Sequence, residues 1–488
     1  MKYKLLLTVF LLFLFNKNIF SQRQANIWYF AENAGINFNV NPPALLTDGT
    51  IQSDTSGNSE GCSSLSDSSG NLLLYASPIS IWNRNHQVMP NGFGLMGGIS
   101  STQGVLILPI PGSSELYYVF TLDEFQNNLA NGLRYSIVDM CLDNGLGDVV
   151  SGQKNILLLD STGEKMAATF HSNGNDIWLV TRKQYTNQFY SYLITSSGIS
   201  NPVISAIGWS DTAGVVENAI GQMKISPNGK KIAFAVSNQY PNVAQLFDFN
   251  NTTGAISNLV DLPVAELGGF LYGVAFSPDN SKLYFTGLPP TGLTQFDLSN
   301  PDPASVANSL TDIQWVNDSN VSYGGTGLQL APDGKIYVVG GNGINVVTNP
   351  NLEGNACNYV ANVFNVDASY TLPEFIDNFK YKTGKQPICD PSGGSTVDTT
   401  DYSCYLSTKI KVSPNPFGNQ LIITSQPMDC KVVMNLYNDL GQLIIKEKLI
   451  ESGVNEMETG NLSSAVYECE FFSDDGSRFT VKVLKKQL

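Results

Sequence analysis

The chain has 488 residues, of which 42% are hydrophobic and only 14% are charged, a balance typical of folded proteins and not of disordered ones. Its 42 acidic residues outnumber the 27 basic ones, and the net charge of -15 would repel a phosphate backbone. Composition therefore excludes a largely disordered protein and disfavours nucleic acid as a partner.

The first element is an apolar run from Leu5 to Phe15, preceded by Lys2 and Lys4. The run has 11 residues, whereas a membrane-spanning helix needs about 20. This order of charge and apolar run predicts a secretory signal peptide over residues 1–21, with a membrane anchor as the less favoured alternative. No later stretch approaches this apolar length, so we expect no transmembrane helix in the mature chain.

Six similar segments occupy the region that follows. Each consists of an apolar strand, a turn rich in Pro, Asp, Asn and Gly, and a second strand of alternating pattern, which predicts a β-hairpin. Their turn centres recur at intervals of 44 to 60 residues, a length that fits a four-stranded propeller blade. The segments begin at Ser63, Leu106, Ala168, Met223, Val274 and Leu328.

This spacing predicts an all-β fold with a β-propeller over residues 23–385. The length of the region favours seven blades, and six remain the alternative because only six hairpins are visible. A propeller can complete its last blade with a strand from the opposite end of the chain, which removes an exposed sheet edge. We expect Asn26 to Phe30 to provide that strand and to lock against the segment around Leu372 to Phe379.

The hairpin sequences also carry a family resemblance. SPNGKKIAF, SPDNSKLYF and APDGKIYV resemble the turn-and-strand motif of YVTN and WD40-like propeller repeats. The strings NIWYFAENAGINFN and IWNRNHQVMPNG resemble a group of large secreted propeller proteins of gliding-type Gram-negative bacteria. This second resemblance implies a surface location, without an established activity.

A change of composition marks the end of the predicted propeller. Residues 390–401, DPSGGSTVDTTD, lack a hydrophobic period and predict a linker. Beyond it, short strands of alternating pattern predict a small Ig-like β-sandwich over residues 411–488.

This last region carries an ordered set of motif residues: Pro414, Asn415, Pro416, Tyr437, Gly441, Tyr467 and Gly476. With them, the region resembles the type A C-terminal sorting domain of the type IX secretion system. The resemblance implies recognition by the type IX translocon, removal of the domain, and a location outside the cell or on the outer-membrane surface of a Gram-negative bacterium. Ala465 departs from the family, which usually has Gly there, and an ordinary Ig-like binding module is the alternative.

Short strings that suggest chemistry lack their structural context. Residues 57–61 fit the GxSxG pattern and residues 92–97 the GxGxxG pattern, but no helix pattern follows either of them. The chain has two histidines and an odd number of cysteines, seven, without a Cys/His cluster. An ordinary buried thiol is the default expectation for each cysteine, and export leaves some disulfides possible. We therefore predict no metal, no cofactor and no catalytic residues.

The function that follows is a binding or interaction module with a surface glycan or protein as its ligand. The richest polar-aromatic loop, with Trp82, Arg84 and His86, is our candidate for ligand contact, although Trp82 could equally serve to fasten neighbouring blades. The alternative is an extracellular hydrolase that acts on glycans through paired carboxylates, because acidic residues could meet across a funnel.

Overall fold

The computed structural model describes residues 23–51, 60–210, 214–237, 242–264, 270–287, 292–314, 326–340, 343–366, 368, 370–377, 410–425, 431–438, 442–473 and 478–486. Internal contacts divide the chain into two compact units, with the main boundary near Gly393. We call them the ring unit, strands β1–β29, and the C-terminal unit, strands β30–β36. The predicted signal peptide, 1–21, and linker, 390–401, lie outside the described residues.

Among the described residues, the ring unit contains seven antiparallel sheets, each built from strands that are consecutive in the sequence. The first sheet contains β1 (Ile27–Ala31), β2 (Ala34–Asn37) and β3 (Ala44–Leu46). The second contains β4 (Ser63–Ser66), β5 (Leu72–Ser77), β6 (Ser80–Asn83) and β7 (Val88–Phe93). The third contains β8 (Val105–Pro109), β9 (Leu116–Leu122), β10 (Leu133–Asp139), β11 (Asp148–Val149) and β12 (Ile156–Leu159).

The remaining four sheets continue in the same order. The fourth contains β13 (Thr162–Phe170), β14 (Ile177–Lys183), β15 (Gln188–Thr195), β16 (Gly198–Ile199) and β17 (Val203–Ala206). The fifth contains β18 (Met223–Ile225), β19 (Lys231–Val236), β20 (Val243–Phe249) and β21 (Ile256–Leu262). The sixth contains β22 (Leu271–Phe276), β23 (Lys282–Gly287), β24 (Leu293–Asp297) and β25 (Thr311–Gln314). The seventh contains β26 (Leu328–Leu330), β27 (Ile336–Gly340), β28 (Gly343–Val347) and β29 (Tyr359–Phe364).

Helical segments in the ring unit are short. None in the described part of the chain is long and apolar enough to cross a membrane. The described helical segments are η1 (Phe125–Asn127), α2 (Leu142–Gly145), η2 (Val216–Ala219), α3 (Pro303–Ala307) and η3 (Gly354–Cys357). The prediction of an all-β fold is confirmed.

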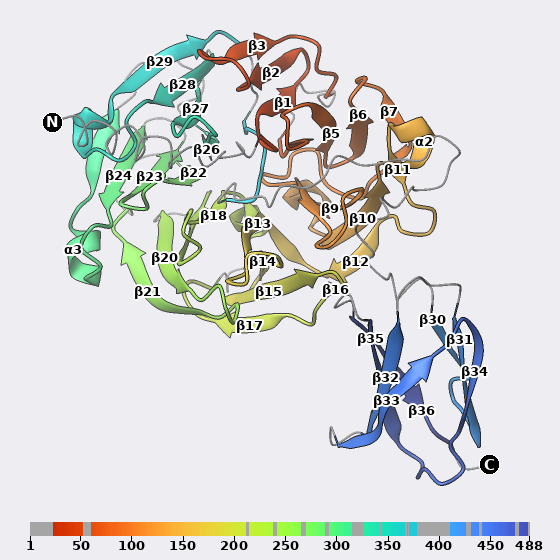
Figure 1. The fold of residues 1–488 in the computed structure, drawn as a ribbon. Helices are drawn as coiled ribbons and strands as arrows, with labels where there is room; N and C mark the ends of the chain where they lie inside the picture. Colours follow the sequence, from red (N-terminus) through yellow and green to blue (C-terminus); the bar gives the residue numbers. More distant parts are fainter. Residues whose placement is uncertain are drawn as a thin grey trace, which may run out of the picture. The chain divides into compact units, whose positions relative to one another are not determined.

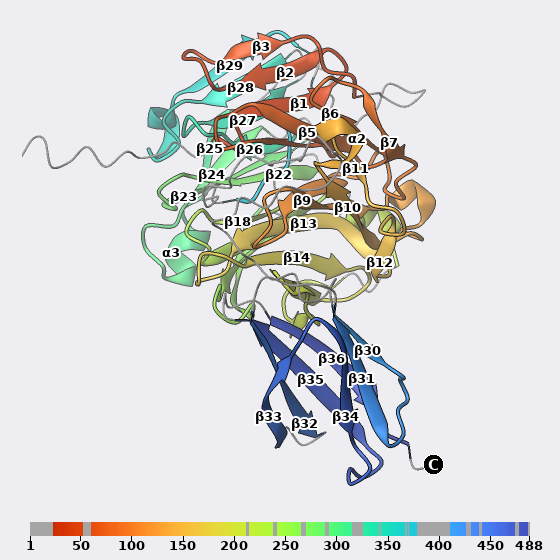
Figure 2. The ribbon, with the colours of Figure 1, turned by 45° about the vertical axis from the view of Figure 1, so that its right-hand side comes forward.

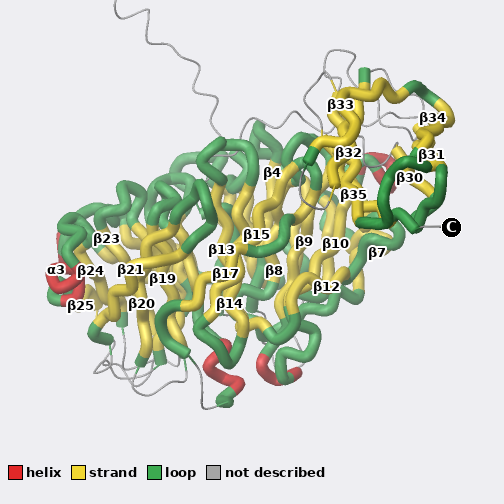
Figure 3. The backbone as a smooth tube through the Cα atoms, turned by 90° about the horizontal axis from the view of Figure 1, so that it is seen from below, coloured by secondary structure: helices red, strands yellow, loops and turns green. Residues whose placement is uncertain are grey.

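The seven sheets follow one another around a common centre (Figure 1). The first strands of neighbouring sheets contact each other near that centre, as β4 does with β8, β13 with β18, β18 with β22, and β22 with β26. Seen from the side, many of the strands run between two layers of loops (Figure 3). The first strands of the sheets therefore bring distant parts of the sequence together near the middle of the ring unit.

Each of the six expected hairpins joins the first two strands of a sheet, from the second sheet to the seventh. The turn between β18 and β19 shows the local cause. Gly229 has φ +68°, a conformation that glycine adopts without strain, and the Asn228 side chain accepts a hydrogen bond from the Lys230 amide. These turn residues favour the hairpin locally, and the Asn228 amide also donates to the Asn280 side chain in the corresponding turn of the sixth sheet.

The N-terminal strand pairs differently from our expectation. Rings of Trp28 and Phe375 lie 5.8 Å apart, so β1 does pack against part of the segment that begins at Leu372. The backbone of β1, however, pairs with β2, because the tight turn after Ala31 returns the chain directly. Phe379 lies outside the described residues.

The segment Tyr370–Asp377 instead crosses the centre of the ring. Its backbone bonds reach three different places: the Gly327 amide donates to the Tyr370 carbonyl, the Glu374 amide to the Cys62 carbonyl, and the Asp377 amide to the Ala168 carbonyl. A single segment thus ties together residues next to the seventh, second and fourth sheets.

The C-terminal unit consists of two antiparallel sheets (Figures 1 and 2). One contains β30 (Ile410–Ser413), β31 (Gln420–Ser425) and β34 (Gly453–Glu458). The other has the order β33 (Leu443–Ile450), β32 (Val432–Asn438), β35 (Val466–Ser473) and β36 (Arg478–Leu484). Alternating residues of both sheets share one buried apolar cluster, which includes Leu421, Ile423, Met434, Leu436 and Phe471.

Cysteines follow the expectation of buried thiols in part. Cys62, Cys357 and Cys469 are buried and free. Cys141, in contrast, is disulfide-bonded, so the default expectation of a buried thiol was wrong at this position.

Candidate functional site

The predicted ligand loop has its aromatic residue in the core. Trp82 is 4% exposed, and its ring stacks on Tyr75 with centroids 5.4 Å apart. Arg84 is exposed and donates through Nη1 to the Gly145 carbonyl at 2.7 Å. His86 lies between Tyr75, whose hydroxyl is 3.2 Å from Nδ1, and Asp48, whose carboxylate is 3.5 Å from Nε2. Of the three predicted contact residues, therefore, only Arg84 and part of His86 reach solvent.

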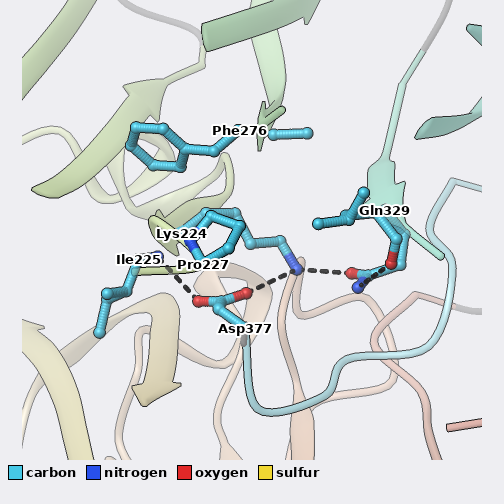
Figure 4. Close-up of a pocket in the computed structure, with 8 residues that line it drawn as sticks. Lys224, Ile225, Pro227, Phe276, Gln329 and Asp377 are labelled. Carbon is cyan, nitrogen blue, oxygen red and sulfur yellow. Dashed lines mark hydrogen bonds and ion pairs between the residues drawn. The ribbon is translucent and has the colours of Figure 1, made fainter. Parts of the chain in front are cut away.

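Sequence reasoning missed a charged cluster at the centre of the ring, which we call the Lys224 cluster. Lys224, on β18, donates to Glu374 at 2.5 Å. It also donates to Gln329 at 2.7 Å, and its Nζ lies 4.0 Å from the Asp377 carboxylate (Figure 4). Gln222 donates to the other oxygen of Glu374 at 3.1 Å. Burial raises the pKa of Asp377 to about 7, although the Lys224 charge opposes the shift.

A small pocket adjoins this cluster. Lys224, Gln329 and Asp377 provide its polar side, and the rest of the lining is mostly apolar, from Ile225, Pro227, Ala275, Phe276 and Leu330 (Figure 4). The polar groups already bond to the protein: Gln329 donates to the Leu330 carbonyl and Asp377 accepts from the Ile225 amide. The arrangement holds the segment Tyr370–Asp377 in place, and it leaves little room for a ligand.

A second buried group, the Glu60 cluster, contains Glu60, Ser100, Thr102, Glu164 and Tyr272. Tyr272 donates to Glu60 at 2.5 Å, and the Ser100 hydroxyl lies 3.5 Å from the other oxygen of Glu60. Glu164 accepts bonds from the amide and hydroxyl of Thr102, each at 2.9 Å. Burial, with the nearby Glu164 charge, raises the pKa of Glu60 to about 8. Glu60 is therefore mostly protonated at neutral pH.

One amide close to the Glu60 cluster lacks hydrogen-bond partners within the described residues. Asn218, on η2, is 3% exposed, and neither its Oδ1 nor its Nδ2 is paired. The next two carbonyls, of Ala219 and Ile220, accept from Lys165, the neighbour of Glu164 on β13. A buried polar group without a partner is costly, and proteins usually satisfy it with water or a ligand.

The C-terminal unit brings together motif residues that are far apart in the sequence. Pro414, Asn415 and Pro416 follow β30, and Asn415 bonds to the backbone of β36. Tyr467, on β35, is buried against Phe417 and donates to the Ser463 carbonyl. Tyr437 lies half-buried on β32, and its hydroxyl accepts from Asn435. The predicted motif residues Gly441 and Gly476 lie outside the described residues.

Residues 411–486 match the family described as secretion system C-terminal sorting domain. They form a type IX sorting domain. The match covers the C-terminal unit and leaves the ring unit unassigned, and no curated protein matches the chain.

Solved structures resemble the chain only in outline. Hydrazine synthase of Kuenenia stuttgartiensis is 11% identical, with a TM-score of 0.35, over 58% of this chain and 72% of that one. A functionally unknown protein from Desulfotomaculum acetoxidans is 14% identical, with a TM-score of 0.31, over 79% of this chain and 95% of that one. The extracellular domain of a B. thetaiotaomicron protein described as a hybrid two component system is 10% identical, with a TM-score of 0.36, over 95% of this chain and 55% of that one. These likenesses carry no conclusion about activity.

The one departure from the sorting-domain motif is accommodated. Ala465 stands just before β35 and is not among the residues with positive φ, so its position does not require glycine. Its carbonyl accepts the Lys485 amide at 2.9 Å, which continues the pairing of β35 with β36. The methyl group of Ala465 packs against the edge of the apolar core of the sorting domain.

Proposed function

We propose that the ring unit is a seven-bladed β-propeller that serves as a binding module outside the cell. Its support is the succession of seven antiparallel sheets around one centre, and the segment Tyr370–Asp377 that fastens them there. A closed ring has no long free edge, so it suits a protein that must persist outside the cell.

Export is the part of the function that rests on the sorting domain. This domain directs the chain through the type IX secretion system, so the protein is secreted or displayed on the cell surface of a Gram-negative bacterium. The sorting domain implies an interaction with the type IX machinery.

The observation that carries the binding role is the combination of exposed apolar residues with the unpaired amide of Asn218. Val215, 38% exposed, precedes η2, and Phe270, 39% exposed, lies two residues before Tyr272 of the Glu60 cluster. Both belong to connections between consecutive sheets, where binding residues commonly lie. An exposed aromatic ring can pack on the apolar face of a sugar, and an unpaired amide can bond to its hydroxyls, so these two features together favour a glycan.

A glycan array with the full-length protein tests this role. We expect Phe270→Ala and Asn218→Ala to lose glycan binding, and Phe93→Ala to keep it. Phe93 is a matched control because it is also an exposed aromatic, 69% exposed, but lies on the outer strand β7. Capture of a surface protein without glycan binding would correct the ligand class, and equal binding by all three variants would contradict the proposed site.

A glycan hydrolase is the second candidate, favoured by the raised pKa of Glu60. A carboxyl that stays protonated near neutral pH is suited to act as a general acid, and Glu164 lies close enough to influence it. Both carboxyls, however, are buried and bonded to protein donors. Binding is therefore the better-supported function, and polysaccharide turnover that is lost in Glu60→Gln would replace it with hydrolysis.

A further inference from the structure

The two ends of the sorting domain meet through one side chain. Asn415 Nδ2 donates to the Lys482 carbonyl at 3.1 Å, and its Oδ1 accepts from the Leu484 amide at 2.9 Å. The two partners are 67 and 69 positions away in the sequence. A single amide thus fastens residues 412–417, which we call the opening motif, to β36, the last strand.

The composition of the opening motif explains why a side chain has to make this connection. Proline has no backbone N–H, so Pro414 and Pro416 cannot donate to a neighbouring strand. The carboxamide of Asn415, with one donor and one acceptor group, takes the place of a peptide unit beside β36. It covers part of a sheet edge that would otherwise be free to pair with another chain.

The backbone continues the connection directly after the prolines. The Phe417 amide donates to the Leu484 carbonyl at 2.8 Å, and the Lys486 amide donates to the Phe417 carbonyl at 3.0 Å. Lys485, 3% exposed, donates to the Gly418 carbonyl and lies 5.6 Å from the centre of the Phe417 ring. The end of the chain is therefore held at its backbone and at one buried lysine.

This joined region presents a distinct surface, which we call the end surface. Its exposed members come from both ends of the domain, and two of them are basic. Lys482 has 74% of its side chain exposed, and its nearest acidic group, Glu468, lies 4.0 Å away. The end surface consists of Pro414, Pro416, Lys482, Leu484 and Lys486.

We propose that the type IX secretion machinery binds this end surface through a complementary acidic face, and that Asn415 is the residue that positions it. This inference rests on the export role of the sorting domain, and it names the part of the domain to which the machinery binds. Its support is that residues 414–417 and 482–486, from the two ends of the domain, are bonded to each other and both include exposed side chains. Lys482 and Lys486 are both exposed, and the ion pair of Lys482 with Glu468 is long, at 4.0 Å, so the two lysines favour a partner that carries carboxylates.

The positioning role of Asn415 is tested with the full-length protein in a type IX-competent cell. We expect Asn415→Ala to accumulate in the periplasm, with loss of surface and secreted protein. Asn455→Ala is the matched control, because the Asn455 side chain also bonds to a backbone amide and carbonyl, those of Glu451, but away from the end surface. Melting temperatures of both variants separate a loss of export from a loss of folding.

The binding surface is tested with substitutions that leave the fold intact. We expect the double variant Lys482→Gln with Lys486→Gln, which removes both charges without placing a carboxylate opposite Glu468, to lose export while its melting temperature changes little. Lys446→Gln with Lys448→Gln, on β33 at the opposite edge of the same sheet, should export normally. Equal export by the two double variants, or by Asn415→Ala and Asn455→Ala, would overturn the proposal. Export of a chain without residues 411–488 would instead contradict the export role itself.

Discussion

In each unit, a buried lysine helps to hold the last described segment in place, but the groups that the two lysines contact differ in kind. In the ring unit, Lys224 pairs with the carboxylate of Glu374, and both side chains are at most 5% exposed. In the sorting domain, Lys485 donates to the neutral Gly418 carbonyl and lies over the Phe417 ring. The first lysine is balanced by opposite charges, mainly Glu374 and, at 4.0 Å, Asp377, whereas the second contacts only neutral groups among the described residues.

This difference predicts different costs of removing a partner. A buried ion pair that loses one member leaves an uncompensated charge in an apolar environment, and this costs more than the loss of one hydrogen bond. The centre of the ring should therefore respond strongly to substitution and to pH. The end of the sorting domain should respond weakly to both.

The largest effect is expected for Glu374→Ala. This change removes the carboxylate that bonds directly to the buried Lys224 ammonium group and leaves only the more distant Asp377, at 4.0 Å, to balance the charge. We therefore expect the free energy of unfolding of the ring unit to fall by about 3–5 kcal/mol. Calorimetry of the full-length protein measures it. The double variant Lys224→Met with Glu374→Leu is the control, because it removes both charges and should recover most of the loss. If Glu374→Ala were as stable as the wild type, the ion pair of Lys224 with Glu374 would not stabilise the ring unit.

A smaller effect is expected for Lys485→Met in the sorting domain. The variant loses the bond to Gly418 and the contact of the charge with the Phe417 ring, but it strands no opposite charge. We expect a loss of about 1–3 kcal/mol, measured by chemical denaturation. A loss as large as that of Glu374→Ala would remove the contrast between the two units.

The stability of the ring unit should also depend on pH more strongly than that of the sorting domain. The pKa of Glu60 is raised from 4.5 to about 8, so between these values the folded ring unit binds a proton that the unfolded chain has released. Its stability should therefore fall as pH rises from 5 to 8. Glu60→Gln should reduce this fall without abolishing it, because Asp377 titrates in the same range. Melting curves at the two pH values check this, and an identical slope in the variant would count against it.

The smallest effect on stability is expected for Arg84→Ala. Its guanidinium group is exposed and makes one bond to a carbonyl, so the change in unfolding free energy should stay within about 0.5 kcal/mol. Trp82→Ala, in the same loop, should cost about 3–5 kcal/mol because the indole is buried. If Arg84→Ala nevertheless weakens ligand binding, the sequence-based prediction of a ligand loop gains support.

Sequence alone predicted the features that depend on neighbouring residues. The turn at Asn228 and Gly229 carries its own conformational signal, so these two residues are enough to place the hairpin of β18 and β19. The bond between Lys224 and Glu374 spans 150 positions, and that between Tyr272 and Glu60 spans 212. No periodicity or spacing reports such pairs, because the ring, and not the local chain, brings them together.

The sorting domain was predictable in part, unlike the long-range bonds of the ring unit. Asn415 and Leu484 are also distant in the sequence, yet the motif that contains Asn415 was identified through its resemblance to a known family. What the resemblance could not provide was the bond between them, which depends on the position of β36 beside the opening motif.

The most direct test of the account is the location of the full-length protein with and without residues 411–488 in a type IX-competent cell. Protease accessibility on intact cells, together with immunodetection in the medium, separates surface and secreted protein from periplasmic protein. We predict that the complete chain appears outside the cell and that the truncated chain stays in the periplasm with its ring unit folded. Appearance of both chains outside in equal amounts would contradict the assignment of export to the sorting domain.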